Sequence, residues 1–194
     1  MRKTILALVC ALSCTVCFAQ HWDFNIGLAL SLPDRYLFGN SDIYDDSGTT
    51  TVNGVSYTKD PKILPTITAE AGYVFPNNRI GAFMGAYWTY AWNDLYGGPS
   101  PLYEKEHILH LVPQVRVYYM YSDKMRMYGT LGMGVRYRTF AETFEGDTIR
   151  SNYLSFSYVL SPFGMSFFDK WTVSFDVGYG SPWSMVKFSA GYRF

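Results

Sequence analysis

The sequence predicts an all-β fold: a transmembrane antiparallel up-and-down β-barrel of eight strands, with short periplasmic turns and longer external loops. Three observations predict it. Aromatic residues make up 19% of the 194 residues, yet the mean hydropathy is only −0.03. Apolar and polar residues alternate with a period of two along several segments, as in strands with one apolar and one polar face. Long polar stretches alternate with turns of a few residues, as in outer-membrane barrels.

Residues 1–19 have the composition of a secretory signal peptide, with a basic start, a short apolar run and small residues at the end. We expect cleavage after Ala19 and a single barrel domain over residues 20–194. Lipoprotein processing at Cys14 or Cys17 is a rival, but the residues before both are poor lipobox matches. All three cysteines lie in this leader, so the mature chain is expected to hold no disulfide and no cysteine metal site.

The first three predicted strands cover residues 22–30, 65–75 and 79–92. In each, every second residue is aliphatic or aromatic, and we assign these residues to the outer face. The residues between them are smaller or polar, and they include Glu70 in the second strand. In the third strand and in the sixth, described below, both faces carry aromatic residues, so alternation alone does not determine which face lies outward.

The fourth and fifth predicted strands, residues 108–121 and 125–140, are joined by a short turn at "SDK". Leucine, valine and methionine mark their outer faces, and glutamine and arginine mark their inner faces. The last three strands cover residues 152–162, 171–180 and 184–194. In the seventh strand the alternation places Asp176 on the inner face.

The connections differ in length between the two ends of the predicted barrel. Polar loops at 31–62, 93–106 and 141–151 alternate with turns of a few residues. Eight strands return both termini to the periplasmic side, so the three loops are expected on the external side. Closure of the barrel pairs every backbone donor and acceptor, as a lipid environment requires.

Amphipathic aromatic rings prefer the interface between lipid and water, so two aromatic girdles are expected on the outer face. One girdle is expected near the periplasmic rim and one near the external rim. The predicted girdle residues are Trp22, Trp88, Trp92, Trp171, Tyr179 and Trp183.

The chain resembles the small eight-stranded outer-membrane barrels of the OmpX-like and OmpA-barrel-like porin families. The resemblance covers the mature length and rests on "LVPQVRVYYMYSDKMRMYGTLGMGVRYR", "SPFGMSF", "FDVGYG" and "FSAGYRF". It implies a monomer and an aromatic C-terminal strand that the barrel-assembly machinery reads. The residues that match this assembly signal are Phe188, Tyr192 and Phe194.

The inward charges are the strongest candidates for a site. The interior of an eight-stranded barrel is just wide enough for side chains to fill, and buried charges must pair. We therefore predict an ion-paired plug centred on Glu70 and Asp176, with a narrow gated ion pathway as the alternative. The predicted lumen network comprises Glu70, Arg116, Arg136, Arg138, Asp176 and Lys187. Of these, Arg136 and Arg138 are expected above the level of the other four.

A lipid A-modifying enzyme is a disfavoured alternative, because the last strand has no histidine and neither His107 nor His110 has a serine two residues on. We expect no enzymatic activity and no cofactor. Aspartates in the 31–62 loop raise the possibility of calcium binding, but the loop lacks a complete calcium pattern, so no metal is predicted.

The function expected from the sequence is a structural or surface-interaction role through the external loops, with outer-membrane lipid and lipopolysaccharide as surrounding partners. In the three long loops, acidic residues outnumber basic ones by eleven to five, and nothing suggests nucleic acid. A narrow channel or small-solute transporter is the alternative. A water-soluble ligand-binding barrel is disfavoured, since the continuous aliphatic face lies opposite the charges.

Overall fold

The computed structural model describes residues 21–31, 49–52, 55–76, 78–96, 102–144 and 147–194. The predicted signal peptide and residues 32–48 of the first long loop lie outside these ranges. In the described residues, no helix is long and apolar enough to cross a membrane. The strands are β1 (His21–Ser31), β2 (Thr49–Val52), β3 (Val55–Ile63), β4 (Thr66–Val74), β5 (Ile80–Tyr96), β6 (Leu102–Tyr121), β7 (Met125–Phe144), β8 (Asp147–Phe167), β9 (Trp171–Gly180) and β10 (Ser184–Arg193).

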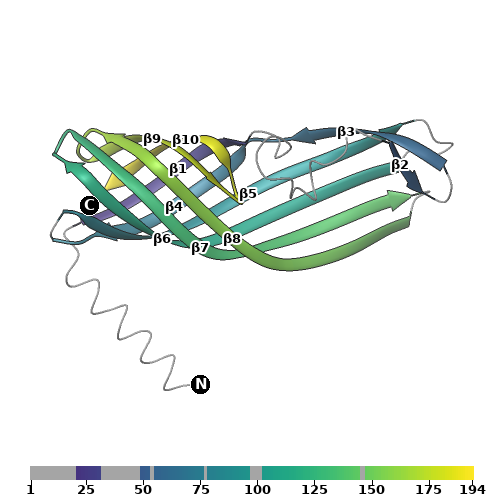
Figure 1. The fold of residues 1–194 in the computed structure, drawn as a ribbon, viewed down its shortest axis with the longest axis horizontal. Coiled ribbons are helices and arrows are strands. Elements are labelled where there is room, and N and C mark those ends of the chain that lie inside the picture. Colours follow the sequence, from purple (N-terminus) through teal and green to yellow (C-terminus); the bar gives the residue numbers. More distant parts are fainter. Residues whose placement is uncertain (1–20, 32–48, 53–54, 77, 97–101, 145–146) are drawn as a thin grey trace, which may run out of the picture.

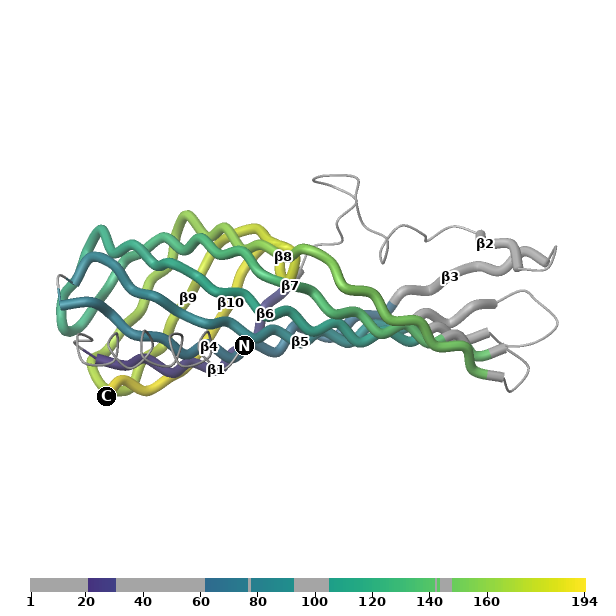
Figure 2. Tube along the Cα trace, turned by 90° about the horizontal axis from the view of Figure 1, so that it is seen from below, coloured from purple at the N-terminus to yellow at the C-terminus, as the bar shows by residue number. Residues whose placement is uncertain are grey.

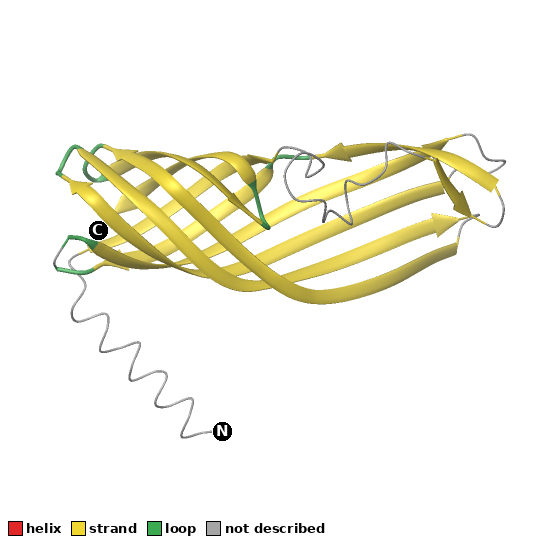
Figure 3. Cartoon of the chain, in the orientation of Figure 1, coloured by secondary structure: helices red, strands yellow, loops and turns green. Residues whose placement is uncertain are grey.

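Eight of these strands form a closed antiparallel barrel (Figures 1 and 3). The order around it is β1, β4, β5, β6, β7, β8, β9 and β10, and β10 pairs again with β1. The β2–β3 hairpin is not a barrel stave, because β3 pairs with β5 beyond the point where β4 begins. The prediction of an all-β, eight-stranded barrel is confirmed.

Side chains alternate between the two faces of the barrel wall as the sequence predicts. Ile26 on β1 is 70% exposed, while its inward neighbours Asp23 and Asn25 are buried. On β5, where both faces carry aromatic residues, Met84 is half exposed and Phe83 is buried. Apolar residues therefore cover the outside, and most buried side chains inside the barrel are polar or charged, next to a smaller set of buried apolar ones.

One end of the barrel, the turn end, holds three tight turns and both described chain ends (Figure 1). The turn between β4 and β5 closes with a bond from Phe75 N to Ile80 O of 2.9 Å. Asn78 in that turn has a φ of 56°, a left-handed conformation that asparagine tolerates. Phe168, between β8 and β9, also has a positive φ, of 70°. At the opposite, loop end, β9 and β10 are joined by a short turn.

Four strands continue past the loop end of the barrel. β5, β6, β7 and β8 are 17, 20, 20 and 21 residues long, whereas β9 and β10 have 10 residues each. With β3 at one edge they form an extension that we name the projecting sheet: residues 91–96, 102–107, 138–144 and 147–155, with β3 (Figure 2).

The structure corrects all three predicted loops: 93–106 and 141–151 are largely strand, and the loop predicted at 31–62 contains β2 and most of β3. Residues 93–96 belong to β5 and 102–106 to β6, while β7 runs to Phe144 and β8 begins at Asp147. The alternation used to define strands is imposed by lipid on one face. It fades where both faces meet water, although the backbone ladder continues.

Candidate functional site

The centre of the lumen holds four buried charges from four different strands. Lys187 Nζ on β10 lies 2.5 Å from Glu70 Oε1 on β4 and 3.4 Å from Asp176 Oδ2 on β9. Arg116 on β6 places its NH2 3.0 Å from Glu70 Oε2. All four residues are at most 4% exposed. The structure therefore brings together four of the six charges that the sequence assigned to a lumen network.

Neighbouring side chains fix Arg116 and Glu70 in place. The Tyr87 hydroxyl donates to Glu70 Oε1 at 2.7 Å, and Gln114 Nε2 donates to Tyr87. The guanidinium of Arg116 lies between two rings, 4.0 Å from the Phe83 centroid and 4.3 Å from the Tyr128 centroid. Because these groups meet from several sides of the wall, side chains fill the bore at this height.

An apolar layer lies next to the charge cluster. Its buried members are Ala29, Tyr87, Val112, Val159 and Trp183.

Trp183 corrects the predicted aromatic girdle. The sequence predicts it on the outer face, but it is only 1% exposed and packs inside the barrel. Lys187 Nζ lies 5.7 Å from the ring centroid of Trp183. The residue precedes β10 in the short connection from β9, where strand alternation no longer determines the direction of a side chain.

Arg136 and Arg138 lie apart from the central cluster, nearer the loop end. Arg138 NH2 donates to Glu106 Oε2 at 3.2 Å, and Arg136 Nε donates to Ser155 Oγ at 2.8 Å. Both arginines lie at the loop-end mouth of the barrel, because β7 extends beyond the central cluster. There each arginine contacts a different partner.

His110 has a serine neighbour that the sequence did not reveal. Its Nδ1 lies 2.9 Å from Oγ of Ser157, which is 47 residues away on β8. The search for a serine two residues after His110 therefore missed this pair, because Ser157 is distant in the sequence. The two residues are 1% and 0% exposed, so a lipid substrate cannot reach them. Their geometry fits a buried polar contact rather than a catalytic pair.

A second charged cluster at the turn end was missed by sequence reasoning. Arg193 Nε lies 2.7 Å from Asp23 Oδ1, and Arg126 NH1 lies 3.9 Å from Asp23 Oδ2. Arg126 NH1 is also 2.9 Å from Nε2 of His21. The alternation of β1 placed Asp23 inside, but only the register of β1 with β10, which sets Asp23 opposite Arg193, reveals the partner.

The remaining girdle and C-terminal aromatics lie on the outer face. Trp88 and Trp171 are 37% and 74% exposed, and Phe188 and Phe194 are 53% and 72% exposed. The rings at the turn end contact one another across strands β9, β10 and β1. Centroid distances there are 4.9 Å for Trp171–Tyr192, 4.8 Å for Tyr192–Phe194 and 5.8 Å for Phe24–Phe194. The other predicted girdle residues, Trp22, Trp92 and Tyr179, are partly exposed.

Among the described residues, the projecting sheet ends on β8, whose outer edge has no strand partner. In the described residues, β8 pairs with β9 only from Val159 onward, so residues 148–157 have a strand partner on the β7 side alone. This edge carries large exposed side chains on both faces. Ile149, Tyr153, Leu154 and Phe156 are 67%, 56%, 72% and 63% exposed.

The described residues contain no group of three or more histidines, cysteines or carboxylates placed to hold a metal ion. The aspartates of the first long loop, for which calcium was weighed, lie outside the residues whose side chains are described.

Comparison with known proteins gives a match in structure alone. No family model matches the sequence, and no curated protein matches it. Two crystal structures of Ail, the attachment invasion locus protein of Yersinia pestis, match with a TM-score of 0.50 and 18% identity, covering 90% of this chain and 98% of Ail. One of them is a complex with the heparin analogue sucrose octasulfate. The chain has an Ail-like eight-stranded barrel fold. The resemblance to OmpX-like barrels thus holds at the level of the fold.

Proposed function

We propose that the chain is a non-catalytic barrel of the outer membrane that is closed across its lumen and acts as a surface-interaction protein through the projecting sheet. In the orientation that we propose in the membrane, the turn end faces the periplasm and the loop end faces the outside of the cell. The apolar outer face supports the membrane location, since side chains such as Ile26 and Val115 remain exposed while charged groups point inward.

The open edge of β8 is the observation that carries the proposal. An unpaired strand edge offers a row of backbone donors and acceptors, and proteins usually protect such edges with charges or proline. Residues 148–157 contain no proline and a single charge, Arg150. An extended segment of a partner protein can add to this edge, with Leu154 and Phe156 contacting alternate side chains.

An adhesion assay with matched variants tests the proposal. Cells that express the wild type are compared with cells that carry Ile149→Lys and Leu154→Lys, on surfaces coated with purified extracellular-matrix proteins. We expect the edge variant to lower adhesion by about fivefold or more, the factor for about 1 kcal/mol. Phe168→Lys is the control, because this phenylalanine is 64% exposed at the turn end. Equal adhesion by the edge variant and the wild type would contradict the role of β8.

The charge balance of this chain does not favour a sulfated ligand such as the sucrose octasulfate bound in one Ail structure. In the sequence of the three predicted loops, eleven residues are acidic and five are basic, a balance that does not favour a polyanion. A protein strand, recognised through its backbone, does not depend on that balance.

Lipopolysaccharide is a second proposed partner, supported by a row of cations on the outer face. Cross-strand pairing sets Lys62 opposite Trp92, Trp92 opposite Lys105, Lys105 opposite Ala141 and Ala141 opposite Arg150. Next to this row, the His107 ring stacks on Trp88 and is tilted against Tyr90, with centroid distances of 6.0 and 4.7 Å. Cations beside an aromatic belt suit lipid phosphates at the interface. Replacing Lys105 and Arg150 by Ser should weaken co-purification of lipopolysaccharide.

A narrow channel is the alternative function. It needs a water path past Glu70, Arg116, Asp176 and Lys187, and their close contacts favour closure instead. Conductance of the purified barrel in planar bilayers distinguishes the two. Discrete openings above the noise of the bilayer would favour the channel.

A further inference from the structure

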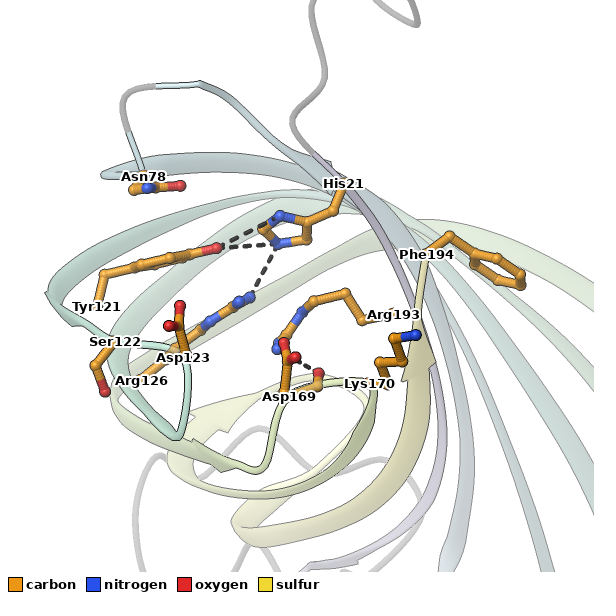
Figure 4. A pocket seen from close by; sticks show the side chains of 10 residues that line it. All are labelled: His21, Asn78, Tyr121, Ser122, Asp123, Arg126, Asp169, Lys170, Arg193 and Phe194. Atoms are coloured by element: carbon orange, nitrogen blue, oxygen red, sulfur yellow. Dashed lines mark hydrogen bonds between the residues drawn. The ribbon is translucent and has the colours of Figure 1, made fainter.

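The turn end of the barrel opens into a cavity that the proposed function leaves unused. It has a volume of about 450 Å³, and His21, Tyr121, Arg126 and Arg193 line its inner part. Asp123, Asp169 and Lys170 stand at its rim (Figure 4). A small organic molecule with several polar groups fits a space of this size.

The inner part of the cavity holds more positive than negative charge. Arg126 and Arg193 are 4% and 6% exposed, and their shared carboxylate is that of Asp23. Arg193 takes the closer contact with Asp23, at 2.7 Å, and also donates to the backbone oxygen of Asp169 at 2.8 Å. Arg126 is left 3.9 Å from the same carboxylate.

Arg126 is the group that points to a ligand. Among the described residues, its Nε is buried and makes no hydrogen bond. Its NH1 donates to Nε2 of His21 at 2.9 Å, so this cation faces a neutral acceptor in addition to the distant Asp23 carboxylate. The Tyr121 ring lies 4.0 Å from the guanidinium and holds its plane (Figure 4). A buried guanidinium with an unmade hydrogen bond is costly, and a carboxylate in the cavity supplies the missing acceptor once the Arg126 side chain turns toward it.

His21 and Tyr121 add donors beside Arg126. Because Nε2 of His21 accepts from Arg126, the proton of the neutral ring lies on Nδ1. The Tyr121 hydroxyl lies 3.4 Å from that Nδ1 and 3.3 Å from Nε2. Tyr121 can turn its hydroxyl proton toward a ligand in the cavity. Together these groups form a pocket wall suited to negative charge.

The rim has the opposite character. Asp123 and Asp169 are exposed, with Lys170 as the cation beside them. The chain's own C-terminal residue is tied to β1, since Phe194 O accepts from Trp22 N at 3.4 Å, and its ring points away from the cavity (Figure 4). A dianion meets repulsion from this rim, whereas an ammonium group meets attraction.

We propose that the turn-end cavity binds a small zwitterion, with its carboxylate at Arg126 and its ammonium group toward Asp123 and Asp169. In the orientation of the proposed function, the ligand enters from the periplasm. Binding itself does not depend on that orientation, so its test is separate from the adhesion assay.

The test is an NMR titration of the refolded barrel in lipid nanodiscs, with arginine side chains labelled at Nε. Alanine is the zwitterionic probe, acetate the anionic probe and ethylammonium the cationic probe. We expect alanine to shift the Arg126 Nε–H signal saturably, acetate to shift it with weaker affinity and ethylammonium to leave it unchanged. No shift with alanine, or equal affinities for alanine and acetate, would overturn the proposal.

Two variants locate the site. Arg126→Lys should weaken alanine binding by about tenfold or more, as loss of a charge-assisted hydrogen bond predicts; binding is followed through the Arg193 signal. Asp123→Asn, on an exposed turn, should weaken alanine binding by about two- to fivefold and leave acetate binding unchanged. Arg136→Lys at the other mouth is the matched control. If neither site variant changes the affinity for alanine, the assignment is contradicted. Because two variants are tested, the assignment can still be tested if one of them folds poorly.

Discussion

Lys187 Nζ lies 2.5 Å from Glu70 Oε1 at the centre of the lumen, and both side chains are 2% exposed. The two residues are 117 positions apart in the sequence, on β10 and β4, with β1 between them in the wall. One contact therefore ties the last strand of the barrel to one of the first and spans part of the bore.

Replacing Lys187 by Met should destabilise the barrel strongly. Asp176 would lose its ion-pair partner and remain buried beside Glu70, and an uncompensated buried charge costs about 3–5 kcal/mol. Urea unfolding in lipid vesicles, followed by tryptophan fluorescence, measures the change. Lys105→Met, at an exposed position, is the control and should change the free energy of unfolding by less than about 0.5 kcal/mol. Similar unfolding midpoints for both variants would refute the importance of the central cluster.

Trp183 and Trp171 should respond differently to lipid. Trp183 is 1% exposed inside the lumen, whereas Trp171 is 74% exposed on the outer face. Brominated lipids quench tryptophan by contact, so a variant with Trp171 as its single tryptophan should be strongly quenched. A variant that retains only Trp183 should be nearly unaffected. Strong quenching of Trp183 would show that its side chain lies on the outer face, in the aromatic girdle.

Gly164 should not tolerate a methyl group. A Cβ at this position would lie 2.7 Å from Tyr128 Cζ and 2.8 Å from Asp176 Oδ1, in the wall of the central cluster. Gly164→Ala is expected to cost about 1–3 kcal/mol through overpacking, measured by urea unfolding. A Cβ at Gly129 would lie 3.5 Å from its nearest atoms, which is an ordinary contact distance. Gly129→Ala therefore serves as the control, and an equal loss in both would show that crowding near Asp176 is not the cause.

Phe194→Ser should slow insertion of the chain into the membrane if the terminal aromatic serves as an assembly signal. The side chain is 72% exposed and contacts Phe24 and Tyr192, so its loss leaves the lumen intact. A pulse-chase experiment that follows the heat-modifiable form measures the rate. Phe168→Ser removes a ring that is 64% exposed from a turn and should have no effect. Normal assembly of Phe194→Ser would remove the proposed signal.

Much of the barrel could be predicted from the sequence because lipid imposes a period of two on every crossing. Glu70, Arg116, Asp176 and Lys187 could be placed inside from alternation alone, since each lies on a strand with a clear apolar face. Their common height follows from register, which the short turns constrain.

The remaining features depend on information that alternation does not hold. The projecting sheet has water on both faces, so its strands read as polar loops. Trp183 follows a turn, where the period is lost. The contacts of Asp23 with Arg193 and of His110 with Ser157 join residues that are 170 and 47 positions apart, and only the closed barrel brings them together.

The location of the barrel in the membrane is tested most directly by electrophoresis of the outer-membrane fraction, comparing unboiled with boiled samples. We predict a band in that fraction that migrates faster when unboiled, because a closed barrel resists unfolding by detergent. A band in the soluble periplasmic fraction with no heat-dependent shift would contradict the membrane barrel and, with it, the display of the projecting sheet on the cell surface.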